Sequence, residues 1–223
     1  MRHLRCSRIY VMPLLMPHLN LTADSAVQLI ELLAETNIKV PAITEGRKEV
    51  HRERYVMAHL LATKAENLFS YPMSVAHREK PDFAINQGEV SIGVECVEAV
   101  PEEWYEIEAI RERKYPNSKN FCIKYTPGHK SLTKTEKEES AAGRGKSYFW
   151  VGDTPEKEWA AAMAHFINVK TTKLRAGNYG DFQENWLLIQ DEWRVPIFDA
   201  DDLSKAVEFF LPLMKETWVP PCF

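Results

Sequence analysis

The chain has 223 residues, of which 45% are hydrophobic and 27% are charged, and its formal net charge is −4 at pH 7. This length suits one domain, or one domain with an insertion, and the slightly acidic balance excludes a protein coated in basic residues. No apolar run approaches the roughly 20 residues that span a bilayer. The cysteines form no C-x-x-C pair for zinc or redox chemistry, which fits a reducing cytoplasm.

Residues 1–47 are expected to form an N-terminal extension and one helix. Three arginines precede a short apolar run that Pro13 interrupts, which favours a short strand or an extension over a signal peptide. The helix is expected to begin near Thr22 or Asp24, because either can cap it and apolar residues then recur at helical spacing.

A second helix is expected from about Gly46 to Phe69, with one buried stripe and a strongly charged first part. It carries two glutamates of interest, Glu53 and Glu66. The alternative is that both are solvated residues on the helix face, with Glu53 paired to a neighbouring arginine. A short strand from Tyr71 to Arg78 is expected to follow.

Residues 81–99 predict a β-hairpin around which the rest of the chain is organised. A short apolar run, a polar loop that contains Gly88, and a second apolar run from Val90 to Val97 follow one another. Because strand side chains alternate, Glu95 lies among apolar neighbours on the face opposite to Val94.

A carboxylate in such a strand is costly to bury unless it is paired or binds a cation. Asp82 stands at the head of the first strand, so pairing of the two strands would bring Asp82 and Glu95 to one end of the sheet. This arrangement suits a divalent metal. A plain hairpin with a surface Asp82 and a salt-bridged Glu95 is the alternative. Glu98 faces away from Glu95 and is expected to be a surface charge.

Residues 111–147 combine basic residues with interleaved aromatic residues, a composition that suits a phosphate backbone and exposed bases. The acidic stretch Glu136–Glu139 opposes this interpretation, and a solvated insertion is the alternative. His77, just before the hairpin, could also contact phosphate. The residues singled out for nucleic-acid binding are Arg78, Lys124, Lys130 and Lys146.

The C-terminal part predicts two helices and three strands. A strand is expected at Ser147–Val151, and then a helix that Thr154 caps, with Pro155 in its first position, and that Gly177 ends. The continuous apolar run Asn185–Ile189 is typical of a central strand buried on both faces. Val195–Phe198 favours one more strand, and Asp199 or Asp202 is expected to cap a last helix over Leu203–Lys215.

Pro81-Asp82 followed by Glu95-x-Val97 resembles the signature of the PD-(D/E)XK nuclease superfamily, except that Val97 stands where the family has a lysine. The resemblance covers residues 48–99 and, more weakly, residues 155–191. Its intervals look like those of the archaeal Holliday-junction resolvases, with 29 positions from Glu53 to Asp82 and 13 from Asp82 to Glu95.

The resemblance implies an α/β (α+β) fold over residues 48–223 with a restriction-endonuclease-like core. That core would contain a helix, a β-hairpin in a mixed sheet, a second helix and a further strand. An inserted basic loop region at about 111–147 and extra terminal helices would complete it.

The resemblance also implies roles for single residues. Mg²⁺ or Mn²⁺ would bind to Asp82, Glu95 and the carbonyl of Cys96, and Glu53 could hold a metal-bound water. Because Val97 cannot supply the missing cation, Lys170 on the later helix is the preferred substitute. Lys173 and Lys80 are weaker choices. The alternative for Lys170 is a residue that favours the negative end of its helix.

The sequence therefore predicts a metal-dependent nuclease that hydrolyses phosphodiester bonds of DNA. The missing lysine at Val97 motivates a competing prediction, a catalytically inactive nuclease-like fold that binds nucleic acid or serves in assembly. An α/β protein unrelated to nucleases is a third alternative, and the formation of a homodimer is left open.

Overall fold

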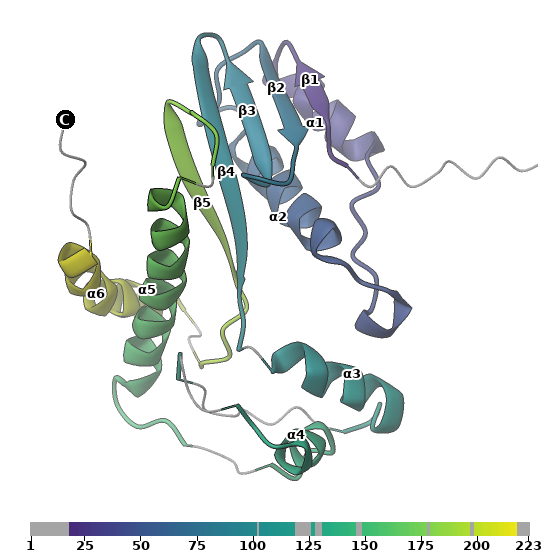
Figure 1. Ribbon diagram of the computed structural model, residues 1–223, viewed down its shortest axis with the longest axis vertical. Coiled ribbons are helices and arrows are strands. Elements are labelled where there is room, and N and C mark those ends of the chain that lie inside the picture. Colours follow the sequence, from purple (N-terminus) through teal and green to yellow (C-terminus); the bar gives the residue numbers. More distant parts are fainter. Residues whose placement is uncertain are drawn as a thin grey trace, which may run out of the picture.

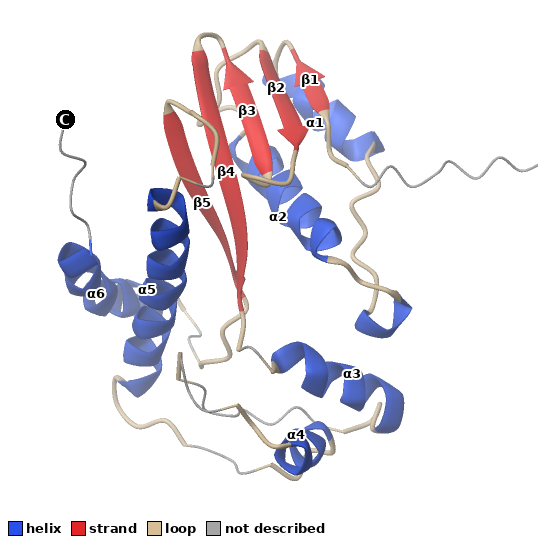
Figure 2. Cartoon of the chain, in the orientation of Figure 1, coloured by secondary structure: helices blue, strands red, loops and turns tan. Residues whose placement is uncertain are grey.

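The computed structural model describes residues 18–101, 103–118, 126–127, 131–145, 149–177, 179–196 and 199–217. Within these ranges the chain is a mixed α/β protein with a five-stranded mixed sheet and six α-helices, as the predicted fold class requires (Figures 1 and 2). The strands lie in the order β1-β2-β3-β4-β5. Helices α1 and α2 cover one face of the sheet, and α5 and α6 lie on its other side (Figure 1).

The first strand, β1 (Leu21–Ala23), was not predicted, and it pairs antiparallel with β2 (Met73–His77). The predicted caps Thr22 and Asp24 are wrong, because helix α1 (Ala26–Glu35) begins at Ser25, whose hydroxyl accepts a hydrogen bond from the Gln28 amide at 3.2 Å. After a single 3-10 turn at Ile43–Glu45, helix α2 runs over Glu49–Lys64, and it is shorter than predicted at both ends.

The predicted hairpin is confirmed. Strand β3 (Phe83–Gln87) pairs antiparallel with β4 (Val90–Ala99), and Gly88 adopts a positive φ of 60° in the tight turn between them. Phe83 lies opposite Val94 in this register, and both side chains are fully buried. The main apolar core forms between this face of the sheet and α1 and α2, and its largest members include Leu29, Met57, Leu61, Phe83, Ile85 and Ile92.

Strand β5 (Glu184–Asp191) pairs parallel with β4 and lies at the edge of the sheet, so the prediction of a central strand is wrong. Its apolar run is explained by cover on both faces, because Leu188 packs on the main core and Ile189 packs on a second core beside α5. Only one neighbouring strand is present among the described residues, and the strand therefore stays half-buried along most of its length.

Helix α5 (Thr154–Arg175) carries Pro155 in its first turn as predicted, but Asp153 and not Thr154 is its N-cap residue. Asp199 begins helix α6 (Ala200–Thr217) by accepting the Asp201 and Asp202 amides at 3.0 and 2.9 Å. Residues 149–151 and 195–196 form no strand, in contrast to the predictions for 147–151 and 195–198. The remaining positions of those two predicted strands, 147–148 and 197–198, lie outside the described residues.

Helix α3 (Trp104–Lys114) begins before the predicted insertion and runs into it, and helix α4 (Lys134–Ala141) lies within it; both helices lie beyond the end of β4 (Figure 1). Helix α4 was not predicted. Its capping box explains it, because Thr133 and Glu136 each accept a hydrogen bond from the other's backbone amide. The acids of this stretch thus belong to a helix.

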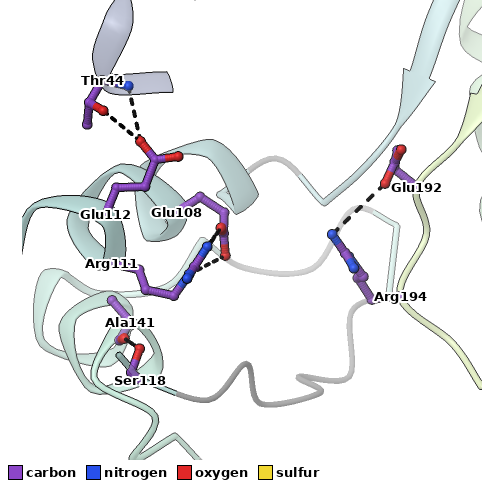
Figure 3. A network of polar contacts seen from close by, with 8 residues as sticks. All are labelled: Thr44, Glu108, Arg111, Glu112, Ser118, Ala141, Glu192 and Arg194. Atoms are coloured by element: carbon purple, nitrogen blue, oxygen red, sulfur yellow. Dashed lines mark hydrogen bonds and ion pairs between the residues drawn. The ribbon is translucent and has the colours of Figure 1, made fainter. Parts of the chain in front are cut away.

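Polar contacts fix the insertion to itself and to the N-terminal half (Figure 3). The Glu112 carboxylate accepts the Thr44 amide at 3.2 Å and the Thr44 hydroxyl at 2.8 Å, and Ser118 donates to the Ala141 carbonyl at 2.7 Å. Lys137 pairs with Glu106 at 2.7 Å across α3 and α4. The described part of the insertion is therefore an ordered helical unit.

Candidate active site

A cleft of about 600 Å³ opens at the end of the sheet between α2 and α5. It is lined from α2 by Glu53, from the hairpin by Asp82 and Glu95, and from α5 by Lys170. The structure therefore brings together the four side chains that the sequence singled out for catalysis.

Asp82 stands directly before Phe83, and because Phe83 pairs with Val94, it lies opposite Glu95 at the end of the β3–β4 ladder. Its Oδ2 accepts a hydrogen bond from the Cys96 amide at 2.7 Å. Burial raises the pKa of Asp82 to about 7, and the charges of Glu95 and Glu53 act in the same direction, whereas the Cys96 amide and Lys170 oppose it. Such crowding of carboxylates is relieved by a bound cation.

Glu95 forms an ion pair with Lys170, whose Nζ lies 2.6 Å from Oε1, and the two side chains are only 18% and 19% exposed. This contact joins β4 to the C-terminal part of α5, five residues before the end of the helix. Tyr179 forms a hydrogen bond with Glu95 as well. Its burial first, and then the charge of Glu95, raise the pKa of Tyr179 to about 12, so the hydroxyl is the donor.

Glu53 is held by His77, a partner that the sequence analysis missed. His77 Nδ1 accepts the Leu19 amide at 3.4 Å, so Nε2 carries the hydrogen that bonds Glu53 Oε2 at 2.9 Å. The His77 side chain is 2% exposed and stacks on Phe83 with ring centroids 4.3 Å apart. The expected contact of His77 with phosphate is wrong, because the side chain is too buried. His77 orients Glu53 instead. Glu66 lies exposed beyond the end of α2 and outside the cleft.

Glu98 is not the surface charge that was expected. Its carboxylate pairs with Arg52 at 2.6 Å and accepts a hydrogen bond from the Tyr105 hydroxyl, while the Arg52 guanidinium lies 4.5 Å from the Tyr105 ring centroid. These contacts tie the end of β4 to α2 and to α3.

Basic residues at the cleft come from two places. Arg78 and Lys80 lie on the loop before Asp82, and Lys173 lies one turn beyond Lys170 on α5. Arg78 also stacks its guanidinium 5.4 Å from the Phe182 ring centroid. Three residues predicted to bind nucleic acid lie outside the described residues: Lys124, Lys130 and Lys146.

Carboxylate oxygens would suit Mg²⁺ or Mn²⁺ better than zinc or copper, which favour nitrogen and sulfur ligands. Within the described ranges, no group of three or more His, Cys, Asp or Glu side chains is gathered so that it could hold an ion on its own. Mg²⁺ keeps several waters and is commonly bound by one or two carboxylates, which Asp82 and Glu95 can supply. The Cys96 thiol is buried with a raised pKa, so it is no ligand, and the role of its carbonyl stays a prediction.

Comparison with models of protein families, with curated proteins and with solved structures finds no match for this chain. In the part of the chain that the structure describes, no helix has the length and apolar character required to cross a membrane.

Proposed function

We propose that this protein is a metal-dependent nuclease that hydrolyses phosphodiester bonds of DNA at the cleft between α2 and α5. The observation that carries the proposal is the position of Lys170, whose Nζ lies 2.6 Å from Glu95 in the cleft that Asp82 also lines. A cation from a distant helix thus reaches the place where the nuclease pattern needs one and where Val97 offers none.

The element order supports the same proposal. Helix α2 precedes three antiparallel strands, β2, β3 and β4, and α5 then leads into β5, which pairs parallel with β4. This succession agrees with the restriction-endonuclease-like core that the motif implies, with α3 and α4 as the insertion. The two carboxylates come from the hairpin at its centre.

Mg²⁺ or Mn²⁺ bound to Asp82 and Glu95 would supply a Lewis acid and lower the pKa of a coordinated water. Lys170 places a positive charge beside that position, where it can orient the attacking water and stabilise the negative charge that develops on the phosphate. Glu53, oriented by the His77 Nε2–H, can accept a hydrogen bond from the same water. The water would lose a proton to Glu53 as its oxygen bonds to phosphorus, the bond to the leaving oxygen would break, and the leaving oxygen would take up a proton from solvent.

Cations around the cleft can contact a strand of linked phosphates. Arg78, Lys80 and Lys173 line the cleft, and so do Glu49 and Glu79 besides the three carboxylates of the site. Within a cleft of about 600 Å³ these cations can neutralise phosphates on either side of the one that is cleaved. Such contacts bind the backbone without reading its sequence.

A catalytically inactive nuclease-like module is the second candidate, because one feature favours it. Glu95 is already engaged by Lys170 and Tyr179, so a metal would compete with an internal ion pair for this carboxylate. Such a module would bind nucleic acid or assemble with a partner but would not hydrolyse phosphodiesters.

Plasmid and oligonucleotide cleavage in Mg²⁺ or Mn²⁺ tests the proposal. Asp82→Asn and Glu95→Gln should abolish cleavage and Lys170→Met should greatly slow it, whereas Glu66→Gln, outside the cleft, should cleave like the wild type. Equal cleavage by all five proteins would indicate a contaminating nuclease and refute the assignment. Absence of cleavage together with absence of calorimetric Mn²⁺ binding would favour the inactive module.

A further inference from the structure

A second cavity of about 240 Å³ adjoins the cleft behind the Glu95–Lys170 pair, between α5 and the strands β4 and β5. It shares Glu95, Lys170 and Tyr179 with the cleft, so the two spaces meet at these side chains. Its walls are mainly aliphatic, from Ile167, Leu174, Leu187 and Ile189. The cavity is a different chemical environment from the charged cleft beside it.

The arrangement of the cavity is set by a close approach of the chain at Gly93. A Cβ atom at this position would lie 2.8 Å from the Phe182 ring and 2.9 Å from Pro81, so only glycine fits. The Phe182 segment is therefore packed against β4. Tyr179, in the same segment, is held where the cavity and the cleft meet.

Two polar groups interrupt the aliphatic walls. Asn185 on β5 carries an amide that can donate and accept side by side, and Thr171 on α5 carries a hydroxyl. An apolar pocket with a few polar groups is the usual form of a small-molecule site. Paired donor and acceptor groups suit the edge of a nucleobase, while aliphatic walls suit its faces.

The position of the cavity beside the cleft further restricts the class of ligand that it can bind. A nucleotide joins a planar base to a phosphate through one sugar, so a base site must adjoin the phosphate site that it serves. Leu174 on the cavity wall is still 37% exposed, which leaves apolar surface for a ligand to cover.

We propose that this cavity binds an unpaired nucleobase of the nucleotide next to the cleaved phosphate. The proposal rests on the nuclease function and names its substrate class: a single strand, or a strand whose base is free of its partner. Extruding a base from a duplex costs a few kcal/mol, so single strands are the better substrate.

The binding test uses deoxyadenosine monophosphate and deoxyribose 5-phosphate as probes, in EDTA, with titration followed by NMR. Deoxyadenosine monophosphate should bind about tenfold more tightly than deoxyribose 5-phosphate, because only the former carries a base. Leu174→Trp, which fills the cavity, should remove this advantage. Val169→Trp on the same helix is the matched control, since Val169 is 39% exposed and lies outside the cavity.

Equal affinity of the wild-type protein for the two probes would by itself overturn the proposal. A folded Leu174→Trp variant that still binds deoxyadenosine monophosphate more tightly than deoxyribose 5-phosphate would overturn it as well. Cleavage of a single-stranded oligonucleotide with a KM that does not depend on an abasic site would also refute the base site, while leaving the nuclease in place. Base binding by a protein that cleaves no DNA would refute the nuclease and keep the cavity as a base site.

Discussion

Lys170 on α5 and Glu95 on β4 meet across the boundary between helix and sheet, with the lysine Nζ 2.6 Å from the glutamate Oε1. Val97, two residues beyond Glu95, lines a small cavity that Lys170 also lines. A lysine at position 97 would therefore enter a cavity that the Lys170 side chain already lines.

Removing this cation should stop cleavage without unfolding the protein. We expect Lys170→Met to lower the cleavage rate by about a hundredfold to a thousandfold, the loss typical of one electrostatic group in an active site. Lys157→Met, near the start of α5 and outside the cleft, should stay within about threefold of the wild type. Val97→Lys in the Lys170→Met background should restore part of the activity. A double variant as inactive as the single one, with its fold intact by circular dichroism, would argue against exchangeable positions.

Lys170→Met should affect metal binding differently from cleavage. Lys170 opposes a second cation at Glu95, so Lys170→Met should bind Mn²⁺ at least as tightly as the wild type although it cleaves poorly. Saturating Mn²⁺ at about 100 times its Kd should stabilise the folded protein by about 2.7 kcal/mol. Asp82→Asn and Glu95→Gln should lose this increase in Tm, and EDTA should reverse it. An equal Mn²⁺-induced Tm shift in both carboxylate variants would place the metal elsewhere.

The raised pKa of Asp82 predicts a pH dependence of stability in EDTA. The folded value is about 7, against an ordinary value of 3.8, so between these pH values the folded state holds a proton that the unfolded state has lost. The proton stabilises the fold at low pH, and this contribution is lost as the pH rises through 7. Asp82→Asn should therefore exceed the wild type in Tm by about 2 to 4 °C at pH 8 and approach it near pH 4. A difference in Tm that does not change with pH would contradict the buried carboxyl.

His77 should act on the reaction through Glu53. His77→Phe keeps a ring against Phe83 but removes the Nε2–H that holds Glu53, so we expect cleavage to fall about tenfold to a hundredfold. Glu53→Gln should show a similar loss, and the double variant should lose no more than the greater single loss. Fully additive losses in the two rates would show that the residues act independently.

The Arg52–Glu98 pair should matter for stability more than for chemistry. Arg52→Met leaves the half-buried Glu98 without its cation, and we expect a loss of about 2 kcal/mol in the free energy of unfolding. Arg52→Met with Glu98→Gln should recover part of that loss. Urea unfolding measures both, and a single variant as stable as the wild type would show that the pair contributes nothing.

The parts of this structure that local rules govern could be predicted, and contacts between distant elements mostly could not. The alternation of side chains along the strands and the turn at Gly88 were sufficient to predict the hairpin and the position of Asp82 opposite Glu95. Strand β1 has only three residues, too few for a periodic pattern, and it exists because β2 offers it a partner. The capping box at Thr133 was a signal for α4 in the sequence, although the many charged residues around it favoured a solvated insertion.

The same distinction between local rules and distant contacts applies to the Lys170–Glu95 and His77–Glu53 contacts of the site. Lys170 could be proposed because a helix after the hairpin must pack on the sheet, but its contact with Glu95 depends on the rotation of α5. His77 and Glu53 belong to elements whose packing angle no local pattern specifies. Nothing in the amino-acid order marks His77 as the partner of a helix residue.

The separation of Lys170 from the hairpin bears on how the site would tolerate changes of sequence. Positions 97 and 170 line one small cavity. In a protein with the proposed function, a lysine at either position would bring its ammonium group into this cavity, so the short run of residues around Glu95 need not contain the cation itself.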